Sequence, residues 1–154
     1  MSKVYFISGF IGSGKTTYSK QLAETKSAFR FSIDEWMLPL FGEHMSREDF
    51  DDRIAKLENL FKESALQMTN LGISVIFDLG YWTKEQRVHC VKWAVENNID
   101  SEIHYLDVSF EECSHRAKNR NENLEGKSYE MTDEMLEMFW SWFEVPSDEK
   151  VVMV

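Results

Sequence analysis

Gly9-Phe10-Ile11-Gly12-Ser13-Gly14-Lys15-Thr16 is the stretch that decides the fold. It fits the pattern G-x-x-x-x-G-K-[ST], in which glycines let the chain turn tightly and bring backbone N–H groups against phosphate oxygens. The apolar residues 4–8 before it predict a buried strand, and residues 16–25 after it predict a helix whose positive N-terminus faces the loop. A plain glycine turn is the alternative, but this strand–loop–helix context favours a nucleoside triphosphate site.

The polar side chains of this loop have expected roles. Lys15 is expected to reach the β- and γ-phosphates, and the Thr16 hydroxyl to ligate Mg²⁺. ATP and Mg²⁺ are therefore the expected cofactors. The remaining nucleotide contacts are expected from Gly9, Gly12, Ser13, Gly14 and Thr17.

Outward from the loop, predicted strands and helices alternate. Further strands are expected at 28–32, 73–78, 102–107 and 151–154. Helices are expected over about 46–72, 83–97 and 132–143, and another follows the capping box of Ser109 and Glu112. This alternation predicts an α/β, three-layer P-loop NTPase fold. Its central sheet is mostly parallel, with about five strands and helices on both faces.

Composition limits the classes of protein. The chain has 154 residues, 43% of them hydrophobic, which suits one globular domain over 1–154. Its 17 Lys and Arg against 27 Asp and Glu give a net charge of −10, which argues against a broad electrostatic grip on nucleic acid or anionic lipid. Cys90 and Cys113 form no disulfide framework, and the N-terminal apolar run is too short to span a membrane. A cytoplasmic protein without a membrane segment is expected.

Two further stretches, Ser32-Ile33-Asp34-Glu35-Trp36 and Val75-Ile76-Phe77-Asp78-Leu79-Gly80, follow or end predicted strands. Together with the loop they resemble the kinases of the AAA_33 type, a group related to the kinase domain of phage polynucleotide kinase, chloramphenicol phosphotransferase and zeta toxins. The resemblance runs from Lys3 to about Arg120 and implies ATP-dependent phosphoryl transfer. The absence of an Asn-Lys-x-Asp motif argues against a GTPase.

The two aspartates in these stretches are the candidate catalytic and metal-binding carboxylates. Asp34 follows the second strand, where a carboxylate can orient an acceptor hydroxyl and take its proton, and the related kinases carry an aspartate there. A helix N-cap is an alternative and compatible role. Asp78 ends an apolar strand, as a Walker-B aspartate that holds Mg²⁺ does, or it is a strand-end turn residue. Gly80 stands where polynucleotide kinase has an asparagine, so that amide has no counterpart here.

Basic residues concentrate at the end of one predicted helix. In related kinases a basic lid here closes on the phosphates, and Arg116 and Arg120 are four residues apart, so both can face one triphosphate. We expect catalytic roles for both within a lid around 109–130 that includes the polar stretch 119–129. Cations that complement the helix dipole are the alternative.

Several other residues are weaker candidates. A solvated helix position is expected for Arg87 and a structural role for Arg53, and no histidines pair at zinc spacing. The aromatic set at 139–143 is expected to be core. Trp36, Tyr81 and Trp82 flank the two aspartates, where either an acceptor pocket or core packing would use them.

The leading hypothesis is transfer of the γ-phosphate of ATP to a hydroxyl of a small-molecule acceptor. A 5′-hydroxyl polynucleotide kinase is one alternative, although it needs a basic channel for the strand. A slow ATPase that acts as a nucleotide-binding regulatory protein is another.

Overall fold

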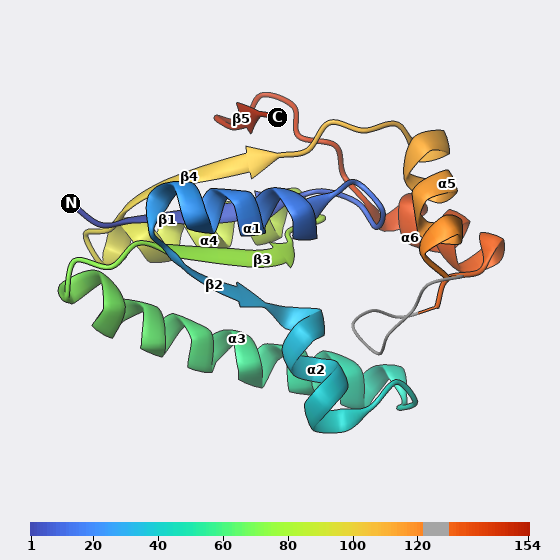
Figure 1. Ribbon diagram of the computed structural model, residues 1–154, viewed down its shortest axis with the longest axis horizontal. Helices are drawn as coiled ribbons and strands as arrows, with labels where there is room; N and C mark the ends of the chain where they lie inside the picture. The colour runs from blue at the N-terminus through green and yellow to red at the C-terminus, as the bar shows by residue number, and fades with distance from the viewer. Residues whose placement is uncertain (122–129) are drawn as a thin grey trace.

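A parallel sheet organises the chain. The computed structural model describes residues 1–121 and 130–154, and five strands in these ranges pair in the order β2-β3-β1-β4-β5 (Figure 1). All four pairings are parallel, which confirms the predicted α/β sheet. The strands are β1 (Lys3–Ser8), β2 (Phe29–Ser32), β3 (Val75–Gly80), β4 (Asp100–Tyr105) and β5 (Val152–Met153).

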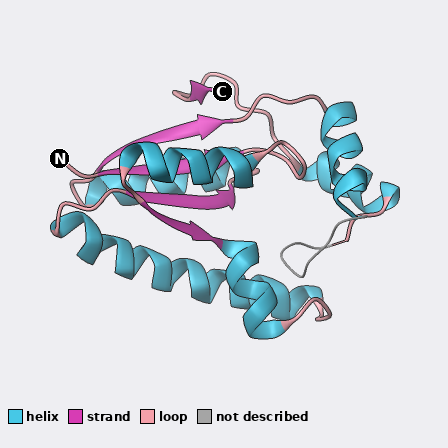
Figure 2. Cartoon of the chain, viewed as in Figure 1, coloured by secondary structure: helices cyan, strands magenta, loops and turns pink. Residues whose placement is uncertain are grey.

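Helices cover both faces of the sheet because its central strands are apolar on both sides (Figure 2). Val4 and Phe6 of β1 belong to the core beneath α3 (Arg47–Asn70) and α4 (Lys84–Glu96). Tyr5 and Ile7 belong to the opposite core, which α1 (Lys15–Lys26) covers. The predicted three layers are therefore present.

Three more helices lie at the carboxyl ends of the strands (Figure 1). They are α2 (Ile33–Phe41), α5 (Phe110–Asn121) and α6 (Asp133–Trp142). A third core joins α5 and α6 to the loop after β1, through Phe10, Cys113 and Leu136. The edge of the sheet that carries the phosphate loop therefore lies between α2 on one side and α5 on the other.

The local sequence explains where several helices begin. The Ser46 hydroxyl accepts from the backbone N–H of Asp49, as expected for the start of α3. Thr83 and Gln86 form a reciprocal capping box at the start of α4, which the sequence analysis did not identify. The separate helix α2 was expected only under the N-cap alternative for Asp34.

Element limits differ from the prediction by two residues at each end of two strands. β4 spans Asp100–Tyr105 rather than 102–107, and β3 spans Val75–Gly80 rather than 73–78. The expected lid of residues 109–130 is described only in part, because residues 122–129 lie outside the described ranges. Over the two described ranges, the helices are all too short or too polar to cross a membrane.

Candidate functional site

The predicted phosphate loop connects β1 to α1, as its sequence context required. Gly12 and Gly14 have φ values of 81° and 95°, in the left-handed region that glycine adopts most readily. The backbone N–H of Ser13 donates to the Phe10 carbonyl at 3.1 Å, which closes a tight turn inside the loop. The remaining N–H groups of the turn and of the first turn of α1 form an anion-binding concavity.

Gly12 has a second function in packing. A Cβ atom at this position would lie 2.2 Å from the carbonyl oxygen of Cys113 in α5, a distance that two such atoms cannot share. The backbone of α5 therefore approaches the loop only because residue 12 lacks a side chain. The base of the predicted lid is packed directly on the phosphate loop.

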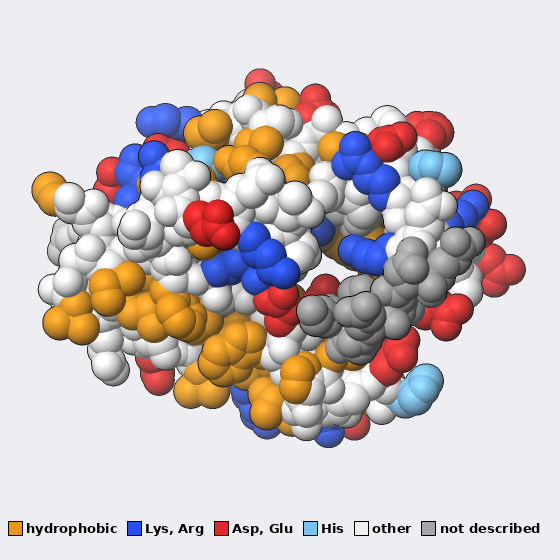
Figure 3. Space-filling view, in the orientation of Figure 1, with side chains coloured by type: hydrophobic (Ala, Val, Ile, Leu, Met, Phe, Trp, Pro, Cys, Tyr) orange, Lys and Arg blue, Asp and Glu red, His pale blue; other side chains and the backbone are white. Residues whose placement is uncertain are grey.

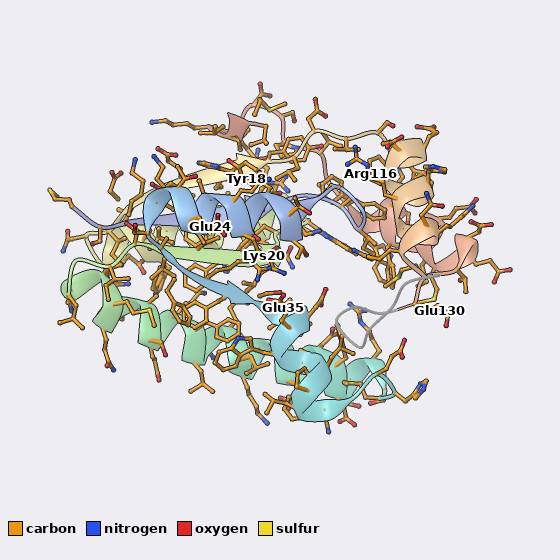
Figure 4. All side chains as sticks on the ribbon, in the orientation of Figure 1. Tyr18, Lys20, Glu24, Glu35, Arg116 and Glu130 are labelled. Carbon is orange, nitrogen blue, oxygen red and sulfur yellow. The ribbon has the colours of Figure 1, made fainter. Side chains whose placement is uncertain are left out.

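The cationic side chains around the loop turn toward its carbonyl groups. The ammonium of Lys15 donates to the Phe10 carbonyl at 3.0 Å, and Nη1 of Arg116 lies 3.4 Å from the Ser13 carbonyl. Arg116, which is labelled in Figure 4, also pairs with Glu112 on its own helix. Lys118 faces the other way and pairs with Asp133 of α6.

Two buried polar atoms at the loop have no hydrogen-bond partner within the described residues, Ser13 Oγ and Arg120 Nε. Buried polar groups are normally paired, and these two are a hydroxyl and a cationic donor beside an anion-binding loop. The donors present therefore fit a phosphate chain. Thr16 and Thr17 are exposed in the first turn of α1, where the Thr16 hydroxyl is free to ligate a metal.

Two cationic and two anionic side chains lie close together beside the loop. Lys15 and Asp34 interact electrostatically with each other and with both Asp78 and Arg120, although the four residues come from α1, α2, β3 and α5. Figure 3 shows a hollow in this region with Lys and Arg side chains above it and Asp and Glu side chains below it. The parallel sheet explains the meeting, because the carboxyl ends of its strands share one edge.

Asp34 lies in the first turn of α2 and is not its N-cap, which is Ser32. No hydrogen bond to the Asp34 carboxylate is found among the described residues. Part of its surface opens to the hollow, but surrounding protein removes enough water to raise the pKa of the carboxyl, against the opposing effect of Lys15. Burial likewise lowers the pKa of Lys15, and Asp78 and Asp34 oppose that shift.

Asp78 is buried within β3, so it is not a turn residue at the end of the strand. Its Oδ2 atom accepts from the Ser19 hydroxyl at 2.8 Å and from Nη2 of Arg30 at 2.9 Å. The sequence analysis did not identify Arg30. A charged residue between Phe29 and Phe31 in a short strand was the available signal, because alternation places it on the face opposite the two aromatic rings.

The connection after β3 is held against the phosphate loop. The backbone N–H of Gly9 donates to the Gly80 carbonyl at 3.0 Å, and the Ser8 hydroxyl donates to the Tyr81 carbonyl at 3.0 Å. Tyr81 has φ 44°, a conformation that a bulky residue rarely adopts. Nη1 of Arg87 donates to the same Tyr81 carbonyl at 2.9 Å.

The expectation of a solvated Arg87 was wrong. Its side chain is fully buried, and its guanidinium pairs with Glu149 through two hydrogen bonds of 2.9 and 3.0 Å. This contact ties the C-terminal segment to the connection after β3. Arg53 is half-buried, with its guanidinium 4.5 Å from the ring centre of Phe41, which suits the structural role expected for it.

The aromatic residues beside the two aspartates divide between the core and the surface. Trp36 packs against Phe31 and Phe61 on the outer side of the sheet. Tyr81 lies in the core against Phe6. Trp82 contacts Phe10 and the aromatic residues of α6, so Tyr81 and Trp82 pack in cores, whereas Trp36 is 41% exposed.

Comparison with known proteins identifies the family and the fold. The family model AAA_33, described as an AAA domain, matches residues 4–146. The comparison with curated protein sequences gave no significant match.

Solved structures share the fold over almost the whole chain. Kti12 of Chaetomium thermophilum, in complex with ADP-AlF3, has a TM-score of 0.72 at 16% identity, covering 98% of this chain and 88% of its own. A gluconokinase from Sinorhizobium meliloti 1021 has a TM-score of 0.66 at 17% identity, covering 99% and 81%. A chain of the Pnkp1/Rnl/Hen1 RNA repair complex has a TM-score of 0.72 at 20% identity, covering 92% of this chain but only 43% of the other.

Proposed function

The chain belongs to the AAA_33 family of P-loop kinase-type proteins, and from that premise we propose that it is an ATP-dependent phosphotransferase. It moves the γ-phosphate of ATP to a hydroxyl group of a small-molecule acceptor. The observation that carries this proposal is the Asp34 carboxylate. It interacts with Lys15 of the phosphate loop, is exposed to the hollow and has no hydrogen-bond partner in the described ranges.

The phosphate loop is the proposed ATP site. Backbone N–H groups of Gly9–Lys15 hold the β- and γ-phosphates, with Ser13 and Thr17 as further polar neighbours. Lys15 exchanges its bond to the Phe10 carbonyl for the phosphate oxygens. The Thr16 hydroxyl and Asp78 would hold Mg²⁺, which when bound neutralises charge on the β- and γ-oxygens.

Asp34 is the proposed acceptor of the proton. The acceptor oxygen attacks the γ-phosphorus, the bond between this phosphorus and the oxygen of ADP breaks, and the hydroxyl proton passes to the Asp34 carboxylate. The surrounding protein raises the pKa of Asp34 above its ordinary value and so makes its carboxylate a stronger base. The carboxylate remains available because no side chain of the described residues occupies it.

Arg116 and Arg120 are the proposed charge-stabilising residues of a lid around 109–130 in a single domain spanning 1–154. Arg116 reaches the loop carbonyl of Ser13, and Arg120 interacts electrostatically with Lys15 and Asp34. Both therefore approach the phosphate site from α5. Charge that develops on the transferred group would be met by two guanidinium groups from one helix face.

A small acceptor is favoured over a nucleic-acid strand, and the cytoplasm is the proposed compartment. The net charge of −10 opposes a polyanion over most of the surface, while the cations near the loop are required for the triphosphate.

Transfer from γ-³²P-labelled ATP to a library of acceptors tests the proposal. The library contains sugars, nucleosides, antibiotics and 5′-hydroxyl oligonucleotides. Asp34→Asn is expected to bind ATP and to lose transfer by about 10²-fold or more, because only proton acceptance is removed. Asp52→Asn, which changes an exposed carboxylate on α3, is the matched control and should keep full activity.

Each other outcome has a distinct meaning. Transfer by Asp34→Asn at the wild-type rate would contradict the role of this residue. Labelling of oligonucleotides alone would identify a polynucleotide kinase. Slow ATP consumption that no acceptor stimulates would indicate a nucleotide-dependent regulatory protein.

A further inference from the structure

Arg30 is a buried cation beside the phosphate site that the proposed reaction has not yet used. Its side chain is 10% exposed, and each of its three guanidinium nitrogens donates to a different residue. Nε donates to the Ser19 hydroxyl at 2.6 Å, Nη2 to Oδ2 of Asp78 at 2.9 Å, and Nη1 to Oε2 of Glu35 at 2.5 Å. One planar group thus joins α1, β3 and α2.

These contacts fix the orientation of the Asp78 carboxylate. Its Oδ2 atom receives both Arg30 and the Ser19 hydroxyl, whereas Oδ1 has no hydrogen bond within the described residues. A carboxylate held by two donors on one oxygen cannot rotate freely about its terminal torsion. The other oxygen is therefore left in a defined position for a metal or its water.

The third contact reaches the residue next to the proposed base. Glu35 follows Asp34 in the first turn of α2, and its Oε1 atom lies 3.8 Å from Nζ of Lys20 of α1. Both residues are labelled in Figure 4. A displacement of Glu35 would move the first turn of α2 and, with it, Asp34. The metal-facing carboxylate and the base are consequently tied to one guanidinium.

We propose that Arg30 is a positioning residue that sets the Asp78 carboxylate in register with the Asp34 turn of α2. This inference rests on the proposed function. Neutralising a buried carboxylate requires only a positive charge, whereas holding three acceptors through three separate nitrogens of one rigid plane requires the fork of arginine. Lysine at this position would keep the charge and lose the fork.

Arg30→Lys is therefore the decisive variant, and Arg47→Lys, an exposed arginine on α3, is the matched control. Binding of a non-hydrolysable ATP analogue is measured by calorimetry at increasing Mg²⁺ concentrations, so that this readout needs no turnover. We expect Arg30→Lys to fold, to bind the analogue weakly without Mg²⁺ as the wild type does, and to need about 10-fold or more Mg²⁺ for half-maximal enhancement. The kcat of phosphoryl transfer should fall by about the same factor, with a smaller change in KM for the acceptor.

Two ligand-free variants separate positioning from loss of stability. Arg30→Met should lower the Tm by on the order of 10 °C, because it leaves the buried Asp78 carboxylate without its guanidinium partner and leaves Glu35 only the more distant Lys20. Adding Asp78→Asn should restore part of that loss if Asp78 is the main partner. No restoration would contradict the pairing on which the proposal depends.

The outcomes distinguish the inference from the proposed function. If the wild-type chain binds the analogue with Mg²⁺ and Arg30→Lys shows the same Mg²⁺ dependence and kcat, Arg30 does not position Asp78 and only this inference is overturned. A lower Tm in Arg30→Lys with unchanged Mg²⁺ dependence has the same meaning. Failure of the wild-type chain to bind the analogue would overturn the proposed function and this inference together.

Discussion

Replacing Arg87 by methionine should remove a large part of the stability of this protein. Arg87 is fully buried on α4, and its guanidinium donates twice to Glu149 and once each to the carbonyls of Tyr81 and Trp82. Methionine fills a similar volume but offers neither charge nor donors. The Glu149 carboxylate, whose side chain is 10% exposed, would then lack its cation.

The size of the effect follows from this burial. Removing one partner of a buried ion pair costs about 3–5 kcal/mol of stability. The free energy of unfolding of an ordinary domain is about 5–15 kcal/mol. For a chain of this length, about 2–4 °C of Tm corresponds to 1 kcal/mol, so the Tm should fall by about 6–20 °C. The affinity for ATP should also fall, because Arg87 holds the connection that contacts the phosphate loop.

Urea unfolding followed by tryptophan fluorescence measures the loss of stability, with Lys92→Met as the control. Lys92 pairs with Glu96 on the exposed side of the same helix, at 3.7 Å, and its loss should cost less than about 0.5 kcal/mol. A change of less than 1 kcal/mol in Arg87→Met, on the order of a surface substitution, would refute the reasoning.

The pH dependence gives an independent check. Hydrogen bonds from Arg87 hold the pKa of Glu149 below its ordinary value of 4.5. The Glu149 carboxylate therefore stabilises the folded state. This stabilisation is complete at a pH above the pKa of Glu149 in the unfolded chain, and it is lost as the pH falls through the lower pKa of Glu149 in the folded protein. The gap between wild type and Arg87→Met should accordingly narrow below about pH 4.5. A gap that stays constant from pH 7 to pH 3.5 would contradict the pairing.

Three further substitutions and one control test the packing around the site. Gly12→Ala should lower both Tm and ATP affinity, because its Cβ would meet the Cys113 carbonyl at 2.2 Å. Gly72→Ala has a similar positive φ but open space around it, and should cost only about 1–2 kcal/mol in urea unfolding. Thr83→Ala should cost about 1 kcal/mol through loss of the α4 cap, and an unchanged unfolding midpoint would count against that cap. Tyr81→Phe should leave thermal stability equal or higher, because the buried Tyr81 hydroxyl has no partner in the described ranges, and a clear loss would show that it has one.

The sequence was informative where structure depends on local pattern. The phosphate loop could be located from its glycines and Lys15, because the turn and the following helix need those residue types at that spacing. Asp34 and Asp78 could be placed at one edge because the strands that precede or contain them are apolar and parallel. Their meeting with Lys15 and Arg120 is the arrangement expected from the topology.

The sequence was uninformative where a charge is buried by a distant partner. Arg30 reaches Asp78 across 48 positions, and Arg87 reaches Glu149 across 62 positions. Hydropathy treats an arginine as exposed unless the pairing is known, and pairing is decided by tertiary structure. The aromatic residues beside the aspartates were ambiguous for the same reason, since Trp36 lines either a pocket or a core depending on which way its helix faces.

The division of positive charge has a consequence for binding. Arg30 and Arg87 are committed to carboxylates of the chain itself, whereas Lys15 donates to a neutral carbonyl of the phosphate loop and Arg116 divides its donors between Glu112 and the Ser13 carbonyl. A charge-assisted bond to a phosphate oxygen is stronger than a bond to a carbonyl, so a triphosphate would displace the two carbonyl contacts at little cost. These cationic side chains are already held at the loop. The conformational entropy that they lose on being ordered is therefore lost when the chain folds, not when the triphosphate binds. An acidic protein can therefore bind a polyanion with few cations, provided that each is positioned beforehand.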